Sequence, residues 1–229
     1  MRCGASTPDL NSGRAAFRPK IHLHPLSGFS EPALYVKPSD HSLPPLILLH
    51  GSGGTEIDML TVAAASAPGA AAFSVRGAVT WEGGYAFFKR FPDRRINEDS
   101  LRAEAPALAA FVTDTVAHHF RSKAILVGFS NGAIMAAALV MLFPGLFQGA
   151  ALLRPLSPFV TPPEAKLSAM PVLLVDALND ARRAVGDGIE MASQLHRLGA
   201  AVTHHSLLTD RSLTEGDLSL LKAWLGERR

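Results

Sequence analysis

Short apolar runs alternate along the chain with glycine-containing or polar turns and with longer stretches that favour helix. Short continuous apolar runs bounded by turn residues are typical of strands buried in a parallel sheet. The runs that predict strands are Leu46–Leu49, Phe73–Val75, Ala124–Val127, Gly149–Leu153, Pro171–Val175 and Ala201–Leu207. Helices are predicted over Asp99–Phe120, Ala133–Phe143, Gly188–Leu198 and Leu213–Leu225. This alternation predicts an α/β fold with a mostly parallel sheet and helices on both faces.

Several element ends carry their own signals. Asp99 is a candidate cap for the long helix that follows it, and Pro106 predicts either a kink or a later start for that helix. Thr214 and Asp217 are candidates for the start of the last helix. At the other end of the chain, the two apolar runs Ile21–His24 and Ala33–Val36 predict a leading hairpin.

One serine stands between a predicted strand and a predicted helix. Ser130 lies between Gly128 and Gly132 in the stretch AILVGFSNGAIMAAALV. The chain must reverse sharply there, and glycines without a Cβ let the strand and the helix approach closely. The pattern G-x-S-x-G also arises by chance in glycine-rich chains, but the strand before it and the helix after it favour a serine nucleophile with its hydroxyl turned outward.

A second glycine-rich segment follows the strand Leu46–Leu49 and reads HGSGG over residues 50–54. Attack by a serine on a carbonyl creates an oxyanion, which needs fixed N–H donors. The backbone N–H groups of Asn131 and Ser52 are the candidate donors, with Gly53 as an alternative to Ser52. Neither familiar phosphate-loop pattern occurs in the chain, and we interpret His50 as structural.

Composition narrows the class of protein. The 229 residues fit one domain over 21–229, preceded by a flexible leader over 1–20. The charged fraction is 18% and the net charge is +2, with both signs interspersed. This charge pattern does not indicate a basic surface that would bind nucleic acid or an anionic membrane. Cys3 is the one cysteine, so we expect no internal disulfide and no cysteine-based metal site.

Location and partners follow from the same data. The N-terminal segment lacks the apolar core of a secretory signal, and Ala133–Phe143 is about half the length of a membrane span, so we expect a cytoplasmic protein without a span. No metal or other cofactor is expected, because the histidines show no ligand pattern. The expected partner is a small-molecule ester or a related ligand, and a homodimer is compatible with the sequence.

Five segments in order, LILLHGSGG, FSVRGAV followed by FFKRF, VGFSNGAIMAAAL, ALLRPLSP and PVLLVDALNDA, resemble the bacterial phospholipase/carboxylesterase family. This family includes acyl-protein thioesterase-like and hydroquinone-resistance esterases, and the resemblance runs from about Leu46 to Trp224. It implies an α/β-hydrolase fold, a nucleophile at Ser130 and small ester substrates. It also implies an acid at Asp180, with Asp176 and Asp187 as weaker alternatives.

The resemblance breaks down at the expected base. Where the family reads G-G-H-E-L-T, this chain reads T-D-R-S-L-T over residues 209–214, which places Arg211 at the histidine position. A guanidinium cannot accept the serine proton. We expect Arg211 to pair with Asp180 through both nitrogens and to fill the space of the imidazole. His204 and His205 lie within a predicted strand and point to opposite faces, so neither is expected to replace the base.

The aromatic residues that follow the strand Phe73–Val75 have two interpretations that the sequence leaves equally open. They form either an apolar pocket wall beside the nucleophile or part of the core, and they are Trp81, Tyr85, Phe87, Phe88 and Phe91. We interpret Arg94 and Arg95 as solvated, and Arg154 as a residue that can tether a loop.

Two functions therefore remain. The first is a serine hydrolase of the carboxylesterase type that forms an acyl-enzyme on Ser130, with turnover impaired by Arg211. The second is a hydrolase-fold protein that binds a small ligand with weak or absent turnover, because a fold alone does not fix function.

Overall fold

The computed structural model describes residues 32–120 and 122–228. The expected leader over residues 1–20, the strand at Ile21–His24 and Cys3 lie outside these residues. Among the described residues, none of the helices is long and apolar enough to cross a membrane.

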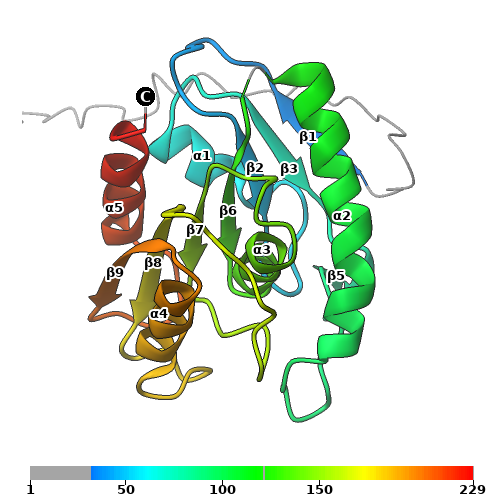
Figure 1. Cartoon of the computed structure of the whole chain (residues 1–229), viewed down its shortest axis with the longest axis vertical. Helices are drawn as coiled ribbons and strands as arrows, with labels where there is room; N and C mark the ends of the chain where they lie inside the picture. Colours follow the sequence, from blue (N-terminus) through cyan, green and yellow to red (C-terminus); the bar gives the residue numbers. More distant parts are fainter. Residues whose placement is uncertain (1–31, 121, 229) are drawn as a thin grey trace, which may run out of the picture.

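Within the described residues, seven strands form one sheet in the order β1-β3-β2-β6-β7-β8-β9 (Figure 1). Their bounds are β1 (Ala33–Val36), β2 (Leu46–Leu49), β3 (Ala72–Val75), β6 (Ile125–Phe129), β7 (Gly149–Leu153), β8 (Pro171–Ala177) and β9 (Ala201–Leu207). β1 runs antiparallel to β3, and every other pair in this sheet is parallel. Two short strands, β4 (Val79–Trp81) and β5 (Gly84–Ala86), form a separate hairpin. The predicted mostly parallel sheet is confirmed.

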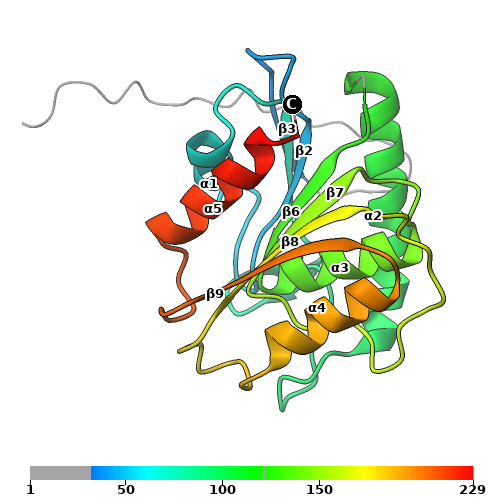
Figure 2. The same cartoon turned by 60° about the vertical axis from the view of Figure 1, so that its left-hand side comes forward.

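Five helices in the described part of the chain cover the sheet: α1 (Leu60–Ser66), α2 (Glu98–His119), α3 (Asn131–Leu142), α4 (Asp187–Arg197) and α5 (Glu215–Gly226). α1 and α5 lie on one face and α2, α3 and α4 on the other, as Figure 2 shows most clearly. Strand β2 explains the two layers: Ile47 and Leu49 pack under α2 and α3, whereas Leu46 and Leu48 pack under α1 and α5. Because side chains alternate along a strand, an all-apolar strand fits only a sheet covered on both faces.

Two expectations for α2 are wrong. The cap is Asn97 rather than Asp99, because the Asn97 Oδ1 accepts a hydrogen bond of 3.0 Å from the Ser100 N–H. Asp99 instead lies in the first turn, where its negative charge interacts favourably with the helix dipole. The later start is also wrong, since the helix continues through Pro106. Neither α1 nor the β4–β5 hairpin was predicted.

The start of α5 follows the sequence signal. Thr214 is the N-cap, and the Asp217 carboxylate accepts hydrogen bonds of 2.8 Å from both the backbone N–H and the hydroxyl of Thr214. The described partner of β1 is β3, with Ala33 opposite Val75, while the other half of the predicted leading hairpin lies outside the described residues.

Candidate active site

Ser130 lies at the sharp turn between the end of β6, the middle strand of the sheet, and the start of α3. Figure 1 shows β6 and α3 next to each other. Its φ of 54° and ψ of −108° lie outside the regions that ordinary residues prefer. The turn is held because the Ser130 N–H donates to the Leu153 carbonyl oxygen at 2.8 Å. Strained residues of this kind cluster at functional sites, where the surrounding structure holds them in place.

The two glycines of the turn are required by close backbone approach. A Cβ on Gly128 would lie within 3.0 Å of backbone atoms of Gly132, and a Cβ on Gly132 would lie within 3.0 Å of the Leu49 carbonyl oxygen. Real Cβ atoms essentially never come so close, and backbone atoms cannot rotate away. The spacing of glycines around Ser130 therefore has a packing reason at this site.

Gly132→Ala is expected to lower the free energy of unfolding by about 1–3 kcal/mol, because the added methyl overpacks the junction between β2 and α3. Urea denaturation followed by circular dichroism measures this. Gly145→Ala is the matched control: a Cβ at Gly145 meets nothing within 4 Å, and its effect should be close to zero. Equal effects of the two substitutions would contradict the packing argument.

The two candidate oxyanion donors differ in exposure: Ser52 lines the cavity beside Ser130, whereas Asn131, the first residue of α3, is fully buried. Gly53 is not available, because its N–H donates to the Tyr85 carbonyl oxygen at 2.9 Å. Among the described residues, the backbone N–H groups of Ser52 and Asn131 have no acceptor. The Asn131 side chain holds the start of α3 in place, since its Oδ1 accepts a hydrogen bond of 2.7 Å from the Phe87 N–H. Ser52 and Ser130 line one cavity of about 590 Å³.

His50 is structural, as interpreted from the sequence. It is fully buried, its Nε2 accepts from the Gly77 N–H at 3.0 Å, and its Nδ1 lies 2.7 Å from the Gly51 carbonyl oxygen. Acceptance at Nε2 leaves the proton on Nδ1, which donates to Gly51. Burial lowers the pKa of His50 and keeps the ring neutral. The imidazole thereby fixes the loop that presents Ser52.

Arg211 contacts both other members of the candidate triad. Its Nη1 lies 2.9 Å from the Asp180 Oδ2, and its Nη2 donates to the Ser130 Oγ. The expected pairing is confirmed, but the expected two-nitrogen contact with Asp180 is wrong. The long side chain reaches past the buried carboxylate, so one nitrogen is left for the serine. Burial lowers the pKa of Arg211, while Asp180 opposes that shift.

This contact has a direct chemical consequence. A guanidinium donates hydrogen bonds and accepts none, so the Ser130 oxygen is an acceptor in its contact with Arg211. The hydroxyl proton is left without a basic partner. Asp180 is almost fully buried, and its Oδ1 accepts from the Arg182 N–H at 2.9 Å, so the carboxylate is held away from the serine.

The alternative acids and histidines do not reach the serine. Asp176 Oδ2 lies 3.1 Å from the His204 Nε2 beside the first turn of α4. Asp187 accepts from the Ala184 N–H at 2.8 Å. Within residues 32–120 and 122–228, no histidine hydrogen-bonds to Ser130. The prediction that the histidines of β9 do not replace the base is therefore consistent with the geometry.

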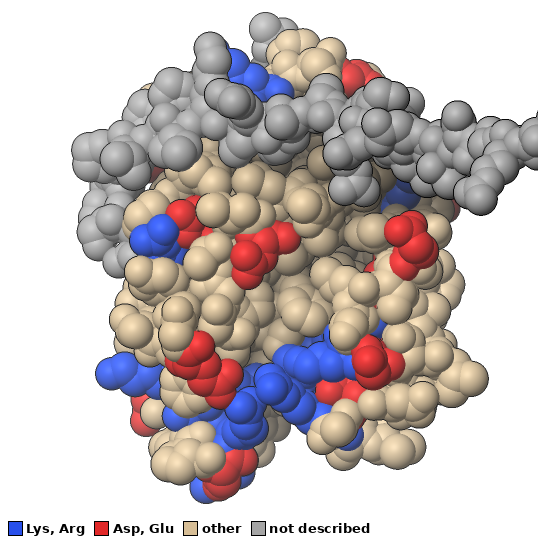
Figure 3. All heavy atoms as spheres, turned by 180° about the vertical axis from the view of Figure 1, so that it is seen from behind, with Lys and Arg blue, Asp and Glu red and all other residues tan. Residues whose placement is uncertain are grey.

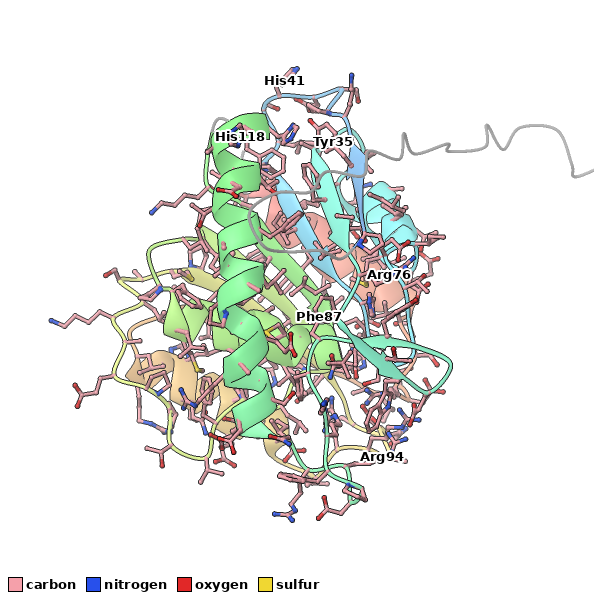
Figure 4. The ribbon with its side chains drawn as sticks, turned by 90° about the vertical axis from the view of Figure 1, so that its right-hand side faces the viewer. Tyr35, His41, Arg76, Phe87, Arg94 and His118 are labelled. Atoms are coloured by element: carbon pink, nitrogen blue, oxygen red, sulfur yellow. The ribbon has the colours of Figure 1, made fainter. Side chains whose placement is uncertain are left out.

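The five aromatic residues occupy different environments: two lie in the core, Trp81 and Tyr85 are half-buried, and Phe91 is exposed. Phe87 and Phe88 are buried in the core, and Figure 4 shows Phe87 beside α2. None of the five aromatic residues lines the cavity that contains Ser130. Arg94 lies at the lower edge of the same view, exposed and 2.7 Å from the Glu82 carboxylate.

Arg154 is a tether, as its position after β7 suggested. The side chain is fully buried, and its Nη1 and Nη2 donate to the two Asp217 oxygens at 2.6 and 2.9 Å. Nη2 also donates to the Ser212 carbonyl oxygen at 3.0 Å. The segment that follows Arg211 is therefore fixed to the end of β7.

The sequence reasoning missed the charge of the cavity. Besides Arg211, its lining includes arginines from two loops that follow strands: Arg90, Arg94, Arg95, Arg182 and Arg183. Figure 3 shows Lys and Arg side chains crowded over the lower part of one face. The sequence does carry a signal for this charge. These arginines lie in the two loops that follow β5 and β8, and both loops line the cavity that contains Ser130.

Comparison with known proteins places the chain in a family. No protein-family model matches it. It is 29% identical over 184 residues to MhqD of Bacillus subtilis (strain 168), which is named as a hydrolase, covering 80% of this chain and 92% of that protein. It is 30% identical to the Bacillus cereus carboxylesterase, with a TM-score of 0.82 and coverage of 87% and 95% of the two chains. The Mesorhizobium loti carboxylesterase is 28% identical, with a TM-score of 0.81 and coverage of 88% and 97%.

These likenesses extend over nearly the whole of each relative. They agree with the mostly parallel sheet, its covering helices and the resemblance expected from the five sequence segments. The chain belongs to the carboxylesterase-type family of α/β-hydrolases.

Proposed function

We propose that this chain is a serine hydrolase that acts on small carboxylic esters through an acyl-enzyme on Ser130, with slow turnover because Arg211 stands at the position of the base. The observation that carries the hydrolase proposal is the strained turn at Ser130, which opens into the same cavity as Ser52. Strain at that point is costly, and a reacting side chain gives a reason to keep it.

The proposed reaction uses the chain's own groups. The Ser130 Oγ attacks the ester carbonyl carbon, and the N–H groups of Ser52 and Asn131 stabilise the oxyanion that forms. Because Arg211 takes no proton, the hydroxyl proton passes to water, and water protonates the departing alcohol. A second water then attacks the acyl-enzyme, releases the carboxylic acid and returns the proton to Ser130.

The rate that remains has a physical basis. Serine hydrolases stripped of triad members keep roughly a 10³–10⁴-fold acceleration over water from the oxyanion hole and from binding. Arg211 also places a positive charge beside the Ser130 oxygen, which favours the attacking alkoxide without removing its proton. We therefore expect slow but measurable hydrolysis of activated aryl esters.

A second candidate function follows from the same contact. If binding rather than turnover is the role, the guanidinium acts as a fixed donor toward a ligand in the cavity, and the fold is kept for its pocket. The observation in favour is that Arg211 donates to both Ser130 and Asp180, so the group at the position of the base cannot accept the serine proton.

Labelling with a fluorophosphonate probe distinguishes the two candidates. We expect slow labelling of the wild type at Ser130, loss of labelling in Ser130→Ala, and unchanged labelling in Ser219→Ala, which removes an exposed hydroxyl on α5. Hydrolysis of 4-nitrophenyl acetate should follow the same order. If the wild type and Ser130→Ala behave alike in both assays, the hydrolase proposal fails and the ligand-binding candidate stands.

A further inference from the structure

The cavity beside Ser130 has an unusual charge balance. Six arginines line it and two carboxylates, Asp93 and Asp187, line it with them. The arginines come from three separate segments: the loop between β5 and α2, the loop between β8 and α4, and the turn before α5. Arginines presented together by separate loops form a positive concavity, which concentrates anions.

Arg94 and Arg95, two of the three exposed arginines that line the cavity, already have acidic partners. Arg94 lies 2.7 Å from Glu82, and Arg95 lies 2.6 Å from Asp93. These pairs are surface ion pairs of the ordinary kind and need no ligand to explain them.

Two half-buried arginines of the cavity, Arg90 and Arg183, differ from these exposed ones. Among the described residues, Arg90 donates only to a backbone carbonyl, that of Arg94 at 2.6 Å. Arg183 donates to three backbone carbonyls: Pro155 at 3.1 Å, Arg154 at 2.6 Å and Arg182 at 3.0 Å. Backbone carbonyls fix the direction of a guanidinium without neutralising its charge. Both side chains are thus held in place and keep N–H groups for a further acceptor.

These held cations also repel one another. Burial lowers the pKa of Arg183 to about 9 and that of Arg90 to about 10, and in each case the charge of Arg211 is the next largest cause. The only carboxylate that pairs directly with one of these three arginines in the described part of the chain is Asp180, with Arg211. An anion placed among them would replace repulsion with charge-assisted hydrogen bonds.

We propose that the ligand of this cavity is a small organic dianion, which carries either two carboxylates or one phosphate and is bound by Arg90, Arg183 and Arg211. Arginine suits this chemistry because its planar fork matches carboxylate and phosphate oxygens. Since Ser130 lines the same cavity, this ligand class rests on the proposed function: the anion forms the acyl or alcohol part of the ester. A volume of about 590 Å³ accommodates such a molecule.

Isothermal titration calorimetry at low ionic strength tests the proposal with four probes. Succinate supplies two carboxylates, glycerol 3-phosphate supplies a phosphate dianion, acetate supplies one charge, and dimethyl succinate is the uncharged match. We expect succinate or glycerol 3-phosphate to bind at least about tenfold more tightly than acetate and dimethyl succinate. The preference between the first two identifies carboxylate or phosphate as the natural group.

Variants locate the binding. Arg183→Gln and Arg90→Gln should each weaken binding of the preferred dianion by about tenfold or more, while Arg197→Gln, an exposed arginine at the end of α4, should leave it unchanged. Circular dichroism checks that each variant is folded. If a variant is not, raising the wild-type ionic strength to about 0.3 M should weaken the same binding several-fold.

Failure of this proposal is distinguishable from failure of the hydrolase. Ser130→Ala should retain dianion binding, because the arginines and not the hydroxyl bind the charge. Dianions that bind no more tightly than dimethyl succinate, or Arg183→Gln and Arg90→Gln variants that bind like the wild type, would overturn the ligand class even if Ser130 labels with fluorophosphonate. Tight dianion binding with no labelling would instead support the ligand and refute the hydrolase.

Discussion

Arg211→His is expected to raise kcat/KM for 4-nitrophenyl acetate by about 10²–10⁴-fold, the usual contribution of a positioned general base. In the wild type, Arg211 donates to the Ser130 Oγ and to Asp180, so all three triad positions are already in contact. An imidazole in that place accepts the serine proton at one nitrogen and donates from the other to the buried carboxylate. Initial rates at saturating and subsaturating ester measure the change.

The ester-hydrolysing activity of Arg211→His should change with pH in one direction. Only the neutral imidazole accepts a proton, so activity should rise as the pH increases through the pKa of the new histidine and then level off. Asp180 raises that pKa by favouring the charged ring, and the arginines around the cavity lower it. The wild type has no imidazole at this position and should lack this rise.

Arg211→Gln is the matched control, because it removes the guanidinium without supplying a base. We expect its rate to be equal to or a few-fold below that of the wild type, because it loses the positive charge beside the Ser130 oxygen and gains no group that accepts a proton. If Arg211→His gains no more than Arg211→Gln, the missing base does not limit the rate. Brisk turnover by the wild type that is lost in Ser130→Ala would likewise contradict this account and would point to another base.

The sequence predicted most clearly the strands in which every residue is buried. β2 and β7 have the predicted bounds, because each apolar run is one fully buried strand of the sheet. β9 also has the predicted bounds, although its sequence AVTHHSL is not an apolar run and none of its residues is buried. The turn at Ser130 was predictable for a different reason: glycine spacing, a strand and a helix all agree there. Short elements that depend on tertiary contact, such as α1 and the β4–β5 hairpin, left no comparable pattern.

Side-chain contacts were less predictable than positions. The pairing of Arg211 with Asp180 followed from aligned motifs, but the contact with Ser130 depends on how far the guanidinium reaches past the carboxylate. The positive cavity was hidden for another reason. Its arginines are dispersed over more than half of the chain, so a count of interspersed charges suggested no patch, and only the sheet edge brings them together.

Arg154→Met is expected to lower the free energy of unfolding by about 3–5 kcal/mol, the usual cost of removing one partner from a buried ion pair. Both Arg154 and Asp217 are fully buried, so the substitution leaves the Asp217 carboxylate without its counter-ion. The carboxylate keeps only the N–H and hydroxyl of Thr214 as donors. Urea denaturation, with the slope checked for two-state behaviour, measures the loss.

Arg94→Met is the matched control, because it removes an arginine from an exposed ion pair. The Arg94 and Glu82 side chains are 46% and 42% exposed, so water solvates the remaining charge and the cost should be about 0–1 kcal/mol. A loss in Arg154→Met no larger than in Arg94→Met would contradict the assigned role of the buried pair. The double variant Arg154→Met/Asp217→Leu should recover part of the loss, since no buried charge is then unpaired.

The Arg154–Asp217 ion pair connects the stability of the fold to the position of residue 211 in the candidate active site. Arg154 holds the Ser212 carbonyl, and Asp217 accepts hydrogen bonds from Thr214, the N-cap of α5, so the residues directly after Arg211 are fixed at both ends of a short segment. Placing a base within hydrogen-bond distance of Ser130 depends on that segment, because small displacements of a catalytic group are costly. Adding Arg154→Met to Arg211→His should therefore reduce the gained ester hydrolysis by about tenfold or more at a temperature where the double variant is still folded. An undiminished gain would mean that Arg154 stabilises the fold without positioning residue 211.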